Sequence, residues 1–191
     1  MNAGIKCERQ LGEHMTHNSK EELEEKLYEI FWDGPFTIDE LEEYAAEEPE
    51  LAKYWSLYAK YEDHPIYGNN VLTYIGKAEK QDVLKRLKQH DLEREKIYVG
   101  IIYKFESWAK SNSNYEKDWA KHENVIKDAT IISPIEELFI HALWPAGNLR
   151  NKNTAKNSWP FRIFNTGYKG SIPQEVSGHY TLENLPETLK Q

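Results

Sequence analysis

Apolar residues in the first 50 positions recur at the three- and four-residue spacing of helices. They predict one helix over 20–32, capped by Ser19, and a second helix over 37–46. Acidic residues occupy the other face of both segments. We therefore expect residues 1–50 to form an acidic helical extension that begins with a mobile arm. Its charged face is interpreted as exposed to solvent, with a dimer contact or a DNA-mimicking shield as the alternative.

The middle of the chain is rich in aromatic and β-branched residues, which favour strands. The predicted strands are 54–61, 71–75 and 97–105. A short helix is predicted over 80–90, and Pro134 at a first helical position predicts another over 133–143. The fold class that follows is α/β, of the α+β kind: a small, mainly antiparallel three-stranded central sheet flanked by helices.

These patterns divide the chain into three regions: the extension over 1–50, a core over 51–150 that carries the candidate chemistry, and a C-terminal extension over 151–191. No apolar run approaches the roughly 20 residues that span a bilayer, and the N-terminus lacks the apolar segment of a secretory signal. We expect a cytoplasmic protein without membrane contact. The single cysteine, Cys7, excludes an internal disulfide and a multi-cysteine zinc site.

The formal net charge of -8 argues against nucleic-acid binding, but the charge is unevenly distributed. Residues 1–63 hold 17 acidic and 6 basic residues, whereas residues 64–191 hold 15 acidic and 18 basic ones. The stretch 138–174 has no Asp or Glu, and its basic residues are predicted to contact DNA. These are Arg150, Lys152, Lys156, Arg162 and Lys169. Ordinary surface lysines on a loop are the alternative.

The candidate chemistry begins with two tyrosines in consecutive predicted strands. Tyr74 opens the sequence Tyr-Ile-Gly-Lys, which ends at Lys77, and its glycine permits a tight turn. Tyr58 lies sixteen residues before Tyr74, which leaves room for a two-stranded hairpin. Tyr67 is the alternative first tyrosine, but it lies only seven residues before Tyr74, so we prefer Tyr58.

Two later segments carry charged side chains that could face the same place. Arg86 and His90 are four residues apart and therefore share one helix face. By helix geometry Glu136 lies within the apolar sector of its helix, whereas Glu137 faces water. A carboxylate in that sector needs a partner, and a divalent cation would serve. The alternative is a capping box, in which Glu136 bonds back to the Ser133 amide.

Taken in order, these residues resemble the GIY-YIG nuclease superfamily. The run from Tyr74 to Lys77 is similar to the second half of the family's motif. Tyr58 keeps the tyrosine of the first half, although Ser56 and Leu57 replace its glycine and isoleucine. An arginine followed one turn later by a histidine, and a glutamate twelve residues before an asparagine, are most similar to type II restriction endonucleases. The residues that carry the resemblance are Tyr58, Tyr74, Arg86, His90, Glu136 and Asn148.

The resemblance implies a metal-dependent endonuclease that hydrolyses phosphodiester bonds of double-stranded DNA, and a restriction enzyme that acts as a homodimer. Glu136 would hold one Mg²⁺ or Mn²⁺ ion, and Asn148 would brace the loop that follows. A repair or mobile-element nuclease of the same superfamily is one alternative. A catalytically inactive DNA-binding or interaction protein is the other.

The resemblance also implies a role for each remaining residue. Tyr58 would be the general base or would position it. Because an ordinary tyrosine has a pKa near 10, positive charge from Lys77, Arg86 or the metal must lower that pKa. Arg86 would hold the scissile phosphate, to which its planar fork is suited. Tyr74 and His90 would orient the attacking water.

Overall fold

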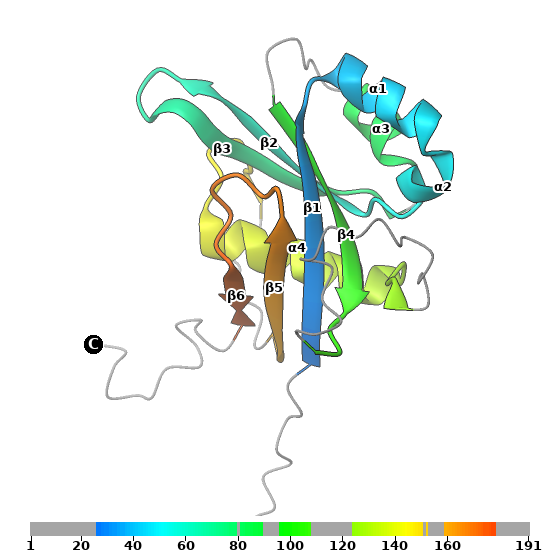
Figure 1. Ribbon diagram of the computed structural model, residues 1–191. Helices are drawn as coiled ribbons and strands as arrows, with labels where there is room; N and C mark the ends of the chain where they lie inside the picture. Colours follow the sequence, from blue (N-terminus) through cyan, green and yellow to red (C-terminus); the bar gives the residue numbers. More distant parts are fainter. Residues whose placement is uncertain are drawn as a thin grey trace, which may run out of the picture.

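The computed structural model describes residues 26–79, 81–89, 96–107, 124–150, 152 and 159–178. Within them, six strands form one mixed sheet that curls into a half-barrel (Figure 1). The strands are β1 (Lys26–Phe36), β2 (Leu57–His64), β3 (Gly68–Lys77), β4 (Lys96–Lys104), β5 (Phe161–Gly167) and β6 (Glu175–Ser177). Their order across the sheet is β3-β2-β4-β1-β5-β6.

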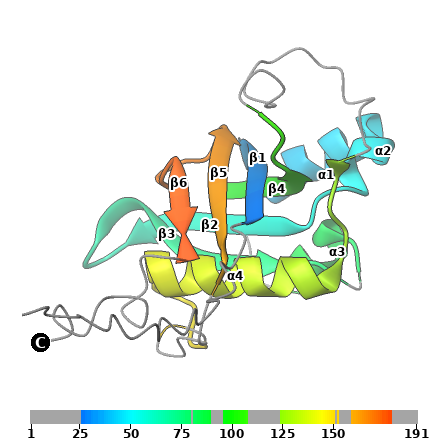
Figure 2. The same cartoon turned by 90° about the horizontal axis from the view of Figure 1, so that it is seen from below.

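Helices cover both faces of this sheet. They are α1 (Ile38–Glu47), α2 (Pro49–Ala52), α3 (Val83–Leu87) and α4 (Ala129–Leu143). Apolar residues of α4, among them Ile135 and Phe139, are buried with Ile75 of β3 on one face. Leu41 of α1 and Leu87 of α3 are buried with residues of β2 and β4 on the other. Figure 2 shows α4 lying along one side of the curled sheet.

The prediction of a small three-stranded sheet flanked by helices is wrong. The three predicted strands exist as β2, β3 and β4, but β1, β5 and β6 double the width of the sheet. β1 pairs antiparallel with β4 and parallel with β5, so the sheet is mixed and β1 lies inside it. The described parts of all three predicted regions therefore contribute strands to one sheet.

The predicted helix over 20–32 is also wrong where the structure describes it, because Lys26–Phe36 is β1. A strand buried on both faces is apolar on both sides, so its sequence lacks clear alternation. Ile30 and Trp32 face the α4 side, whereas Phe31 faces the side of α1. Together with Leu27, the adjacent apolar residues Ile30 and Phe31 therefore give the three- and four-residue spacing that predicts a helix. Ser19 and the rest of that prediction lie outside the described residues.

The helix predicted over 37–46 is confirmed as α1, and Thr37 and Glu40 form a capping box at its start. The helix predicted over 133–143 begins earlier, at Ala129, where the Asp128 side chain accepts a hydrogen bond from the Thr130 amide. Pro134 consequently lies inside α4 rather than at its first position. The capping box proposed between the Ser133 amide and Glu136 is wrong, since Ser133 is not a cap.

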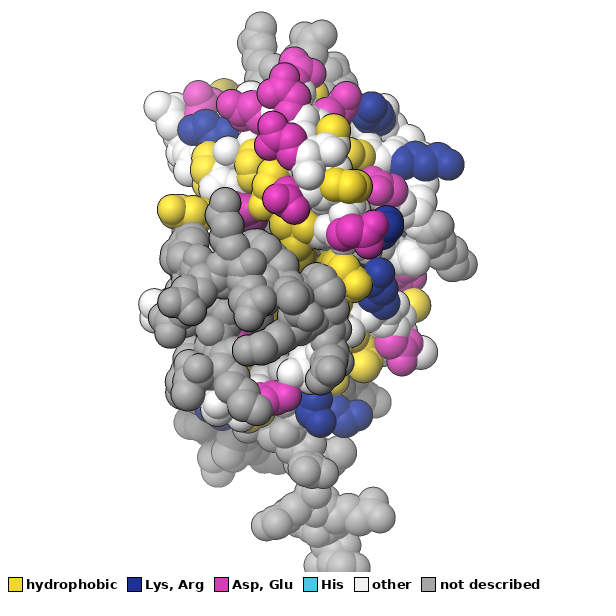
Figure 3. Space-filling model, turned by 45° about the vertical axis from the view of Figure 1, so that its right-hand side comes forward, with side chains coloured by type: hydrophobic (Ala, Val, Ile, Leu, Met, Phe, Trp, Pro, Cys, Tyr) yellow, Lys and Arg dark blue, Asp and Glu magenta, His cyan; other side chains and the backbone are white. Residues whose placement is uncertain are grey.

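None of the helices in the described part of the chain is long and apolar enough to cross a membrane. The first turn of α1 carries Asp39 and Glu40, and further exposed acidic residues follow through the start of α2. Figure 3 shows acidic side chains gathered over the upper part of the face that it presents. This acidic surface faces solvent, as the charge pattern of that segment predicted.

Candidate active site

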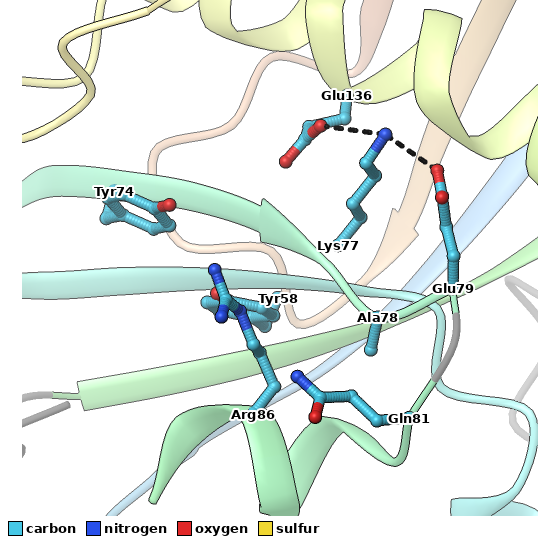
Figure 4. Close-up of a pocket in the computed structure, with 8 residues that line it drawn as sticks. All are labelled: Tyr58, Tyr74, Lys77, Ala78, Glu79, Gln81, Arg86 and Glu136. Carbon is cyan, nitrogen blue, oxygen red and sulfur yellow. Dashed lines mark ion pairs between the residues drawn. The ribbon is translucent and has the colours of Figure 1, made fainter. Parts of the chain in front are cut away.

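A pocket of about 270 Å³ opens where the end of β3 meets α3 and α4 (Figure 4). Five of the residues predicted from sequence line it: Tyr58, Tyr74, Lys77, Arg86 and Glu136. Ala78, Glu79 and Gln81 complete the lining. Side chains from β2, β3, α3 and α4 thus converge on one place, although they are spread over 79 positions of the sequence.

Because successive side chains of a strand point to opposite faces, residues from both faces of the sheet line this pocket. Tyr58 and Tyr74 lie on the side of α3, with stacked rings whose centroids are 6.0 Å apart. Lys77 points the other way, toward Glu136 of α4 (Figure 4). Since β3 is the edge strand, the pocket wraps around that edge. A ligand there would meet the tyrosines on one flank and the lysine and glutamate on the other.

Gly76 makes room for the buried tyrosine of this pocket. It pairs directly with Tyr58 across the β2–β3 hairpin. A Cβ atom at this position would lie 2.5 Å from the Tyr58 hydroxyl and 2.8 Å from a ring carbon of Tyr74. Both distances are well inside normal contact. The glycine of the Tyr-Ile-Gly-Lys sequence is therefore required by the tyrosine opposite rather than by a tight turn.

The Tyr58 hydroxyl is fully buried and meets no hydrogen-bond partner among the described residues. Burial, followed by the neighbouring Tyr74, raises the pKa of Tyr58 to about 12. Arg86 opposes that rise: its guanidinium lies beside the hydroxyl in Figure 4, without the geometry of a hydrogen bond. This hydroxyl lines the pocket and is a candidate ligand contact, because leaving a buried hydroxyl without a hydrogen-bond partner costs about 1–3 kcal/mol.

Lys77 joins the two carboxylates of the pocket. Its Nζ lies 2.6 Å from Glu79 Oε1 and 3.4 Å from Glu136 Oε2. It also donates to the Ser133 hydroxyl, which in turn donates to Glu79. Burial alone lowers the pKa of Lys77, but the hydrogen bond and charge of Glu79, together with Glu136, raise it overall. Lys77 is therefore held charged, and more closely by Glu79 than by Glu136.

Glu136 is the less completely neutralised of the two carboxylates. Its side chain is 13% exposed, and burial raises its pKa although the charge and hydrogen bond of Lys77 act in the opposite direction. Two acidic neighbours stabilise the charged form of Lys77, whereas Glu136 and Glu79 share a single cation. The carboxylate of Glu136 consequently has capacity for a further positive partner.

A divalent cation fits this part of the pocket chemically. Mg²⁺ takes hard oxygen ligands and is often held by only one or two carboxylates, with substrate phosphate and water completing its shell. Glu136 offers one such carboxylate, while Glu79 is engaged by Lys77 and Ser133. Among the described residues no three His, Cys, Asp or Glu side chains come together. Glu136 would thus hold the ion together with the substrate rather than in a preformed cage.

Arg86 comes from the last turn of α3, and its position is set by that short helix. Asp82 caps α3 by accepting from the Leu84 amide, and Val83 and Leu87 are buried beneath it. Arg86 is therefore turned toward the pocket, where Gln89 accepts a hydrogen bond from its Nη1 at 3.0 Å. Part of the guanidinium fork remains directed toward Tyr58 (Figure 4).

Asn148 lies outside the pocket but fixes its edge strand. Its side-chain amide accepts from the Ile75 amide and donates to the Ile75 carbonyl, both at 2.9 Å. The amide of Gly147 donates to the Thr73 carbonyl at 2.6 Å. These bonds cover the free edge of β3 on either side of Tyr74. The predicted bracing residue thus braces β3 and its loop together.

The alternative tyrosine lies elsewhere. Tyr67 is in the turn between β2 and β3, is 68% exposed, and stacks on His64 rather than facing the pocket. Of the predicted DNA contacts, Arg162 forms an ion pair with Glu175 at 3.4 Å, and Lys169 donates to the Ile172 carbonyl. His90 and Lys156 lie outside the described residues.

Two residues of the site were missed by sequence reasoning. Glu79 was not considered, although it lies only two positions after Lys77. The sequence indicates Ser133 only as the cap of a possible capping box with Glu136, three positions later. Its actual neighbours, Lys77 and Glu79, are more than fifty positions away, so no local pattern could have shown the contact.

Comparison with protein-family models, with curated protein sequences and with solved structures finds no match to this chain. What the site can do is therefore inferred from its own residues.

Proposed function

We propose that this chain is a metal-dependent endonuclease that hydrolyses DNA phosphodiester bonds, with the chemistry of the GIY-YIG type that its sequence resembles. The observation that carries the proposal is the convergence of Tyr58, Tyr74, Lys77, Arg86 and Glu136 on one pocket. Two cations, two tyrosine hydroxyls and a partly neutralised carboxylate suit a phosphodiester and an attacking water.

Arg86 is the residue best placed to hold the scissile phosphate. Its guanidinium is beside the unpaired Tyr58 hydroxyl, and a phosphate oxygen between them would satisfy both groups. Lys77 lies on the opposite flank, where its charge is shared between Glu79 and Glu136. Water adds to phosphorus, the bond to the leaving sugar oxygen breaks, and the products are a phosphomonoester and an alcohol.

Tyr58 cannot act as a ready-made general base in this arrangement. With a pKa raised to about 12, only about one molecule in ten thousand carries the phenolate at pH 8. Its role is therefore to orient the water or the phosphate through the neutral hydroxyl. Tyr58 could become a base only if substrate binding draws positive charge nearer than Arg86 lies here. Tyr74, stacked against it, fixes the plane of its ring.

A divalent cation bound at Glu136 would polarise the phosphate and stabilise the leaving oxygen. The chain's own contribution there is to hold the Glu136 carboxylate in place on α4 and to keep Lys77 occupied by Glu79 and Ser133. That arrangement leaves Glu136 available.

The test compares Glu136→Ala with Glu137→Ala on long linear DNA in Mg²⁺ and in EDTA. Glu137 is the adjacent acidic residue of α4 and is absent from the pocket lining, so it controls for loss of charge. We expect cleavage by the wild type and by Glu137→Ala in Mg²⁺ only, and at least a hundredfold loss in Glu136→Ala. Thermal unfolding of both variants verifies the fold. Equal cleavage by the two variants, or cleavage in EDTA, would refute the assignment.

We propose a type II restriction enzyme that cuts both strands as a homodimer, because two active sites suit a symmetric target. Sequencing of the ends distinguishes this from a repair or mobile-element nuclease: restriction gives the same short sequence at every end. Ends that follow DNA structure rather than sequence would contradict it.

A further inference from the structure

Two large apolar side chains are exposed on one short loop beside the candidate active site. The Trp144 loop, residues 144–150, follows α4 and includes Asn148. Trp144 is 58% exposed and Leu149 is 94% exposed. Exposed large apolar residues on a well-fixed loop are a common property of binding surfaces.

Hydrogen bonds to β3 and to Lys152 fix the Trp144 loop. Its Gly147 amide and Asn148 side chain bond to the edge of β3, as described above. Lys152 Nζ donates to the Ala146 carbonyl at 3.4 Å, and the Lys152 carbonyl lies 2.9 Å from Nδ1 of His141 on α4. The exposed Leu149 side chain is therefore carried by an anchored backbone, so little conformational entropy is lost when a ligand covers it.

Charge distinguishes this loop from the exposed apolar tip of the β2–β3 hairpin. Ile66 and Tyr67, at the tip of the β2–β3 hairpin, are 81% and 68% exposed, but Glu62 and Asp63 precede them. The Trp144 loop instead carries the exposed Arg150, within a stretch of sequence that has no acidic residue from 138 to 174. A polyanion is repelled from the hairpin tip and attracted to the loop.

The loop also lies next to the pocket. The two β3 residues that it binds, Thr73 and Ile75, flank Tyr74, which lines the pocket. The loop therefore meets the same edge strand that borders the pocket.

We propose that the Trp144 loop is a duplex-DNA contact in which Leu149 is an apolar wedge. Leu149 enters at a base step, Trp144 covers the adjoining sugar, and Arg150 binds a phosphate. Apolar wedges of this kind unstack a step and bend the duplex. The inference rests on the proposed function, since it names how the same site receives its substrate.

The test uses the full chain in EDTA, with a long duplex and permanganate, which oxidises unstacked thymines. We expect permanganate-reactive thymines with the wild type and with Ile66→Ala, the matched exposed-apolar control. Leu149→Ala should lose this reactivity and bind roughly tenfold more weakly at unchanged salt dependence. Arg150→Ala should instead lower the slope of log affinity against log salt by about one.

The outcomes separate the two proposals. If Leu149→Ala binds and unstacks DNA like Ile66→Ala, while the wild type still cleaves in Mg²⁺, the wedge is refuted and the nuclease is not. If the wild type neither binds nor cleaves duplex DNA, the proposed function fails, and the wedge fails with it. Melting curves of all variants verify that each is folded.

Discussion

Replacing Gly76 by alanine tests whether the pocket is built as described. The new methyl group would lie 2.5 Å from the Tyr58 hydroxyl and 2.8 Å from a ring carbon of Tyr74. Tyr58 is fully buried and cannot swing away without disturbing the core. Overpacking of this kind costs about 1–3 kcal/mol. The better conformational preference of alanine in a strand offsets about 0.5–1 kcal/mol of that cost.

We therefore expect Gly76→Ala to lower the free energy of unfolding by about 1–2 kcal/mol in denaturant titrations. The same substitution in a Tyr58→Leu background should cost less, because the two nearest clashing atoms, both of Tyr58, have been removed and only the contact with Tyr74 at 2.8 Å remains. The double-mutant cycle should give a coupling of about 0.5–2 kcal/mol between positions 58 and 76. Equal losses in both backgrounds would show that the ring does not occupy this space, and the geometry derived for the pocket would be wrong.

Three further predictions concern neighbouring groups. Asn148→Ala should cost about 2–4 kcal/mol in denaturant titrations, since it leaves the buried Ile75 amide and carbonyl unpaired; a loss below about 1 kcal/mol would contradict the bracing role. Tyr58 has a folded pKa near 12 and an unfolded pKa near 10, so the stability from its neutral form is lost as pH rises from about 10 to about 12. Tyr58→Phe should lack that part of the alkaline loss, and identical pH curves for the two proteins would refute the burial of this hydroxyl. Glu79→Gln should lower the cleavage rate about 10–100-fold by releasing Lys77 to Glu136, whereas Glu137→Gln should leave it unchanged; equal rates would remove Glu79 from the site.

The sequence alone determined the local elements that bear the candidate residues. The hairpin of Tyr58 and Tyr74 follows from two β-rich segments at a spacing that allows a turn, and the structure confirms their antiparallel pairing. Helix phase also singled out Glu136 over Glu137, and only Glu136 lines the pocket. These features depend on neighbours within a few residues, which a periodic pattern records.

The width of the sheet and the surroundings of Lys77 depend on contacts between segments that are remote in the sequence. The sequence of β1 predicts a helix because a strand buried on both faces does not alternate apolar and polar residues. The pairing of β1 with β5 joins residues more than 130 positions apart. The contacts of Lys77 with Glu79 and Ser133 exist because α4 crosses the edge of β3. The pKa of Tyr58 likewise depends on burial beneath elements distant in sequence. Each is set by packing between remote segments, on which local sequence carries no information.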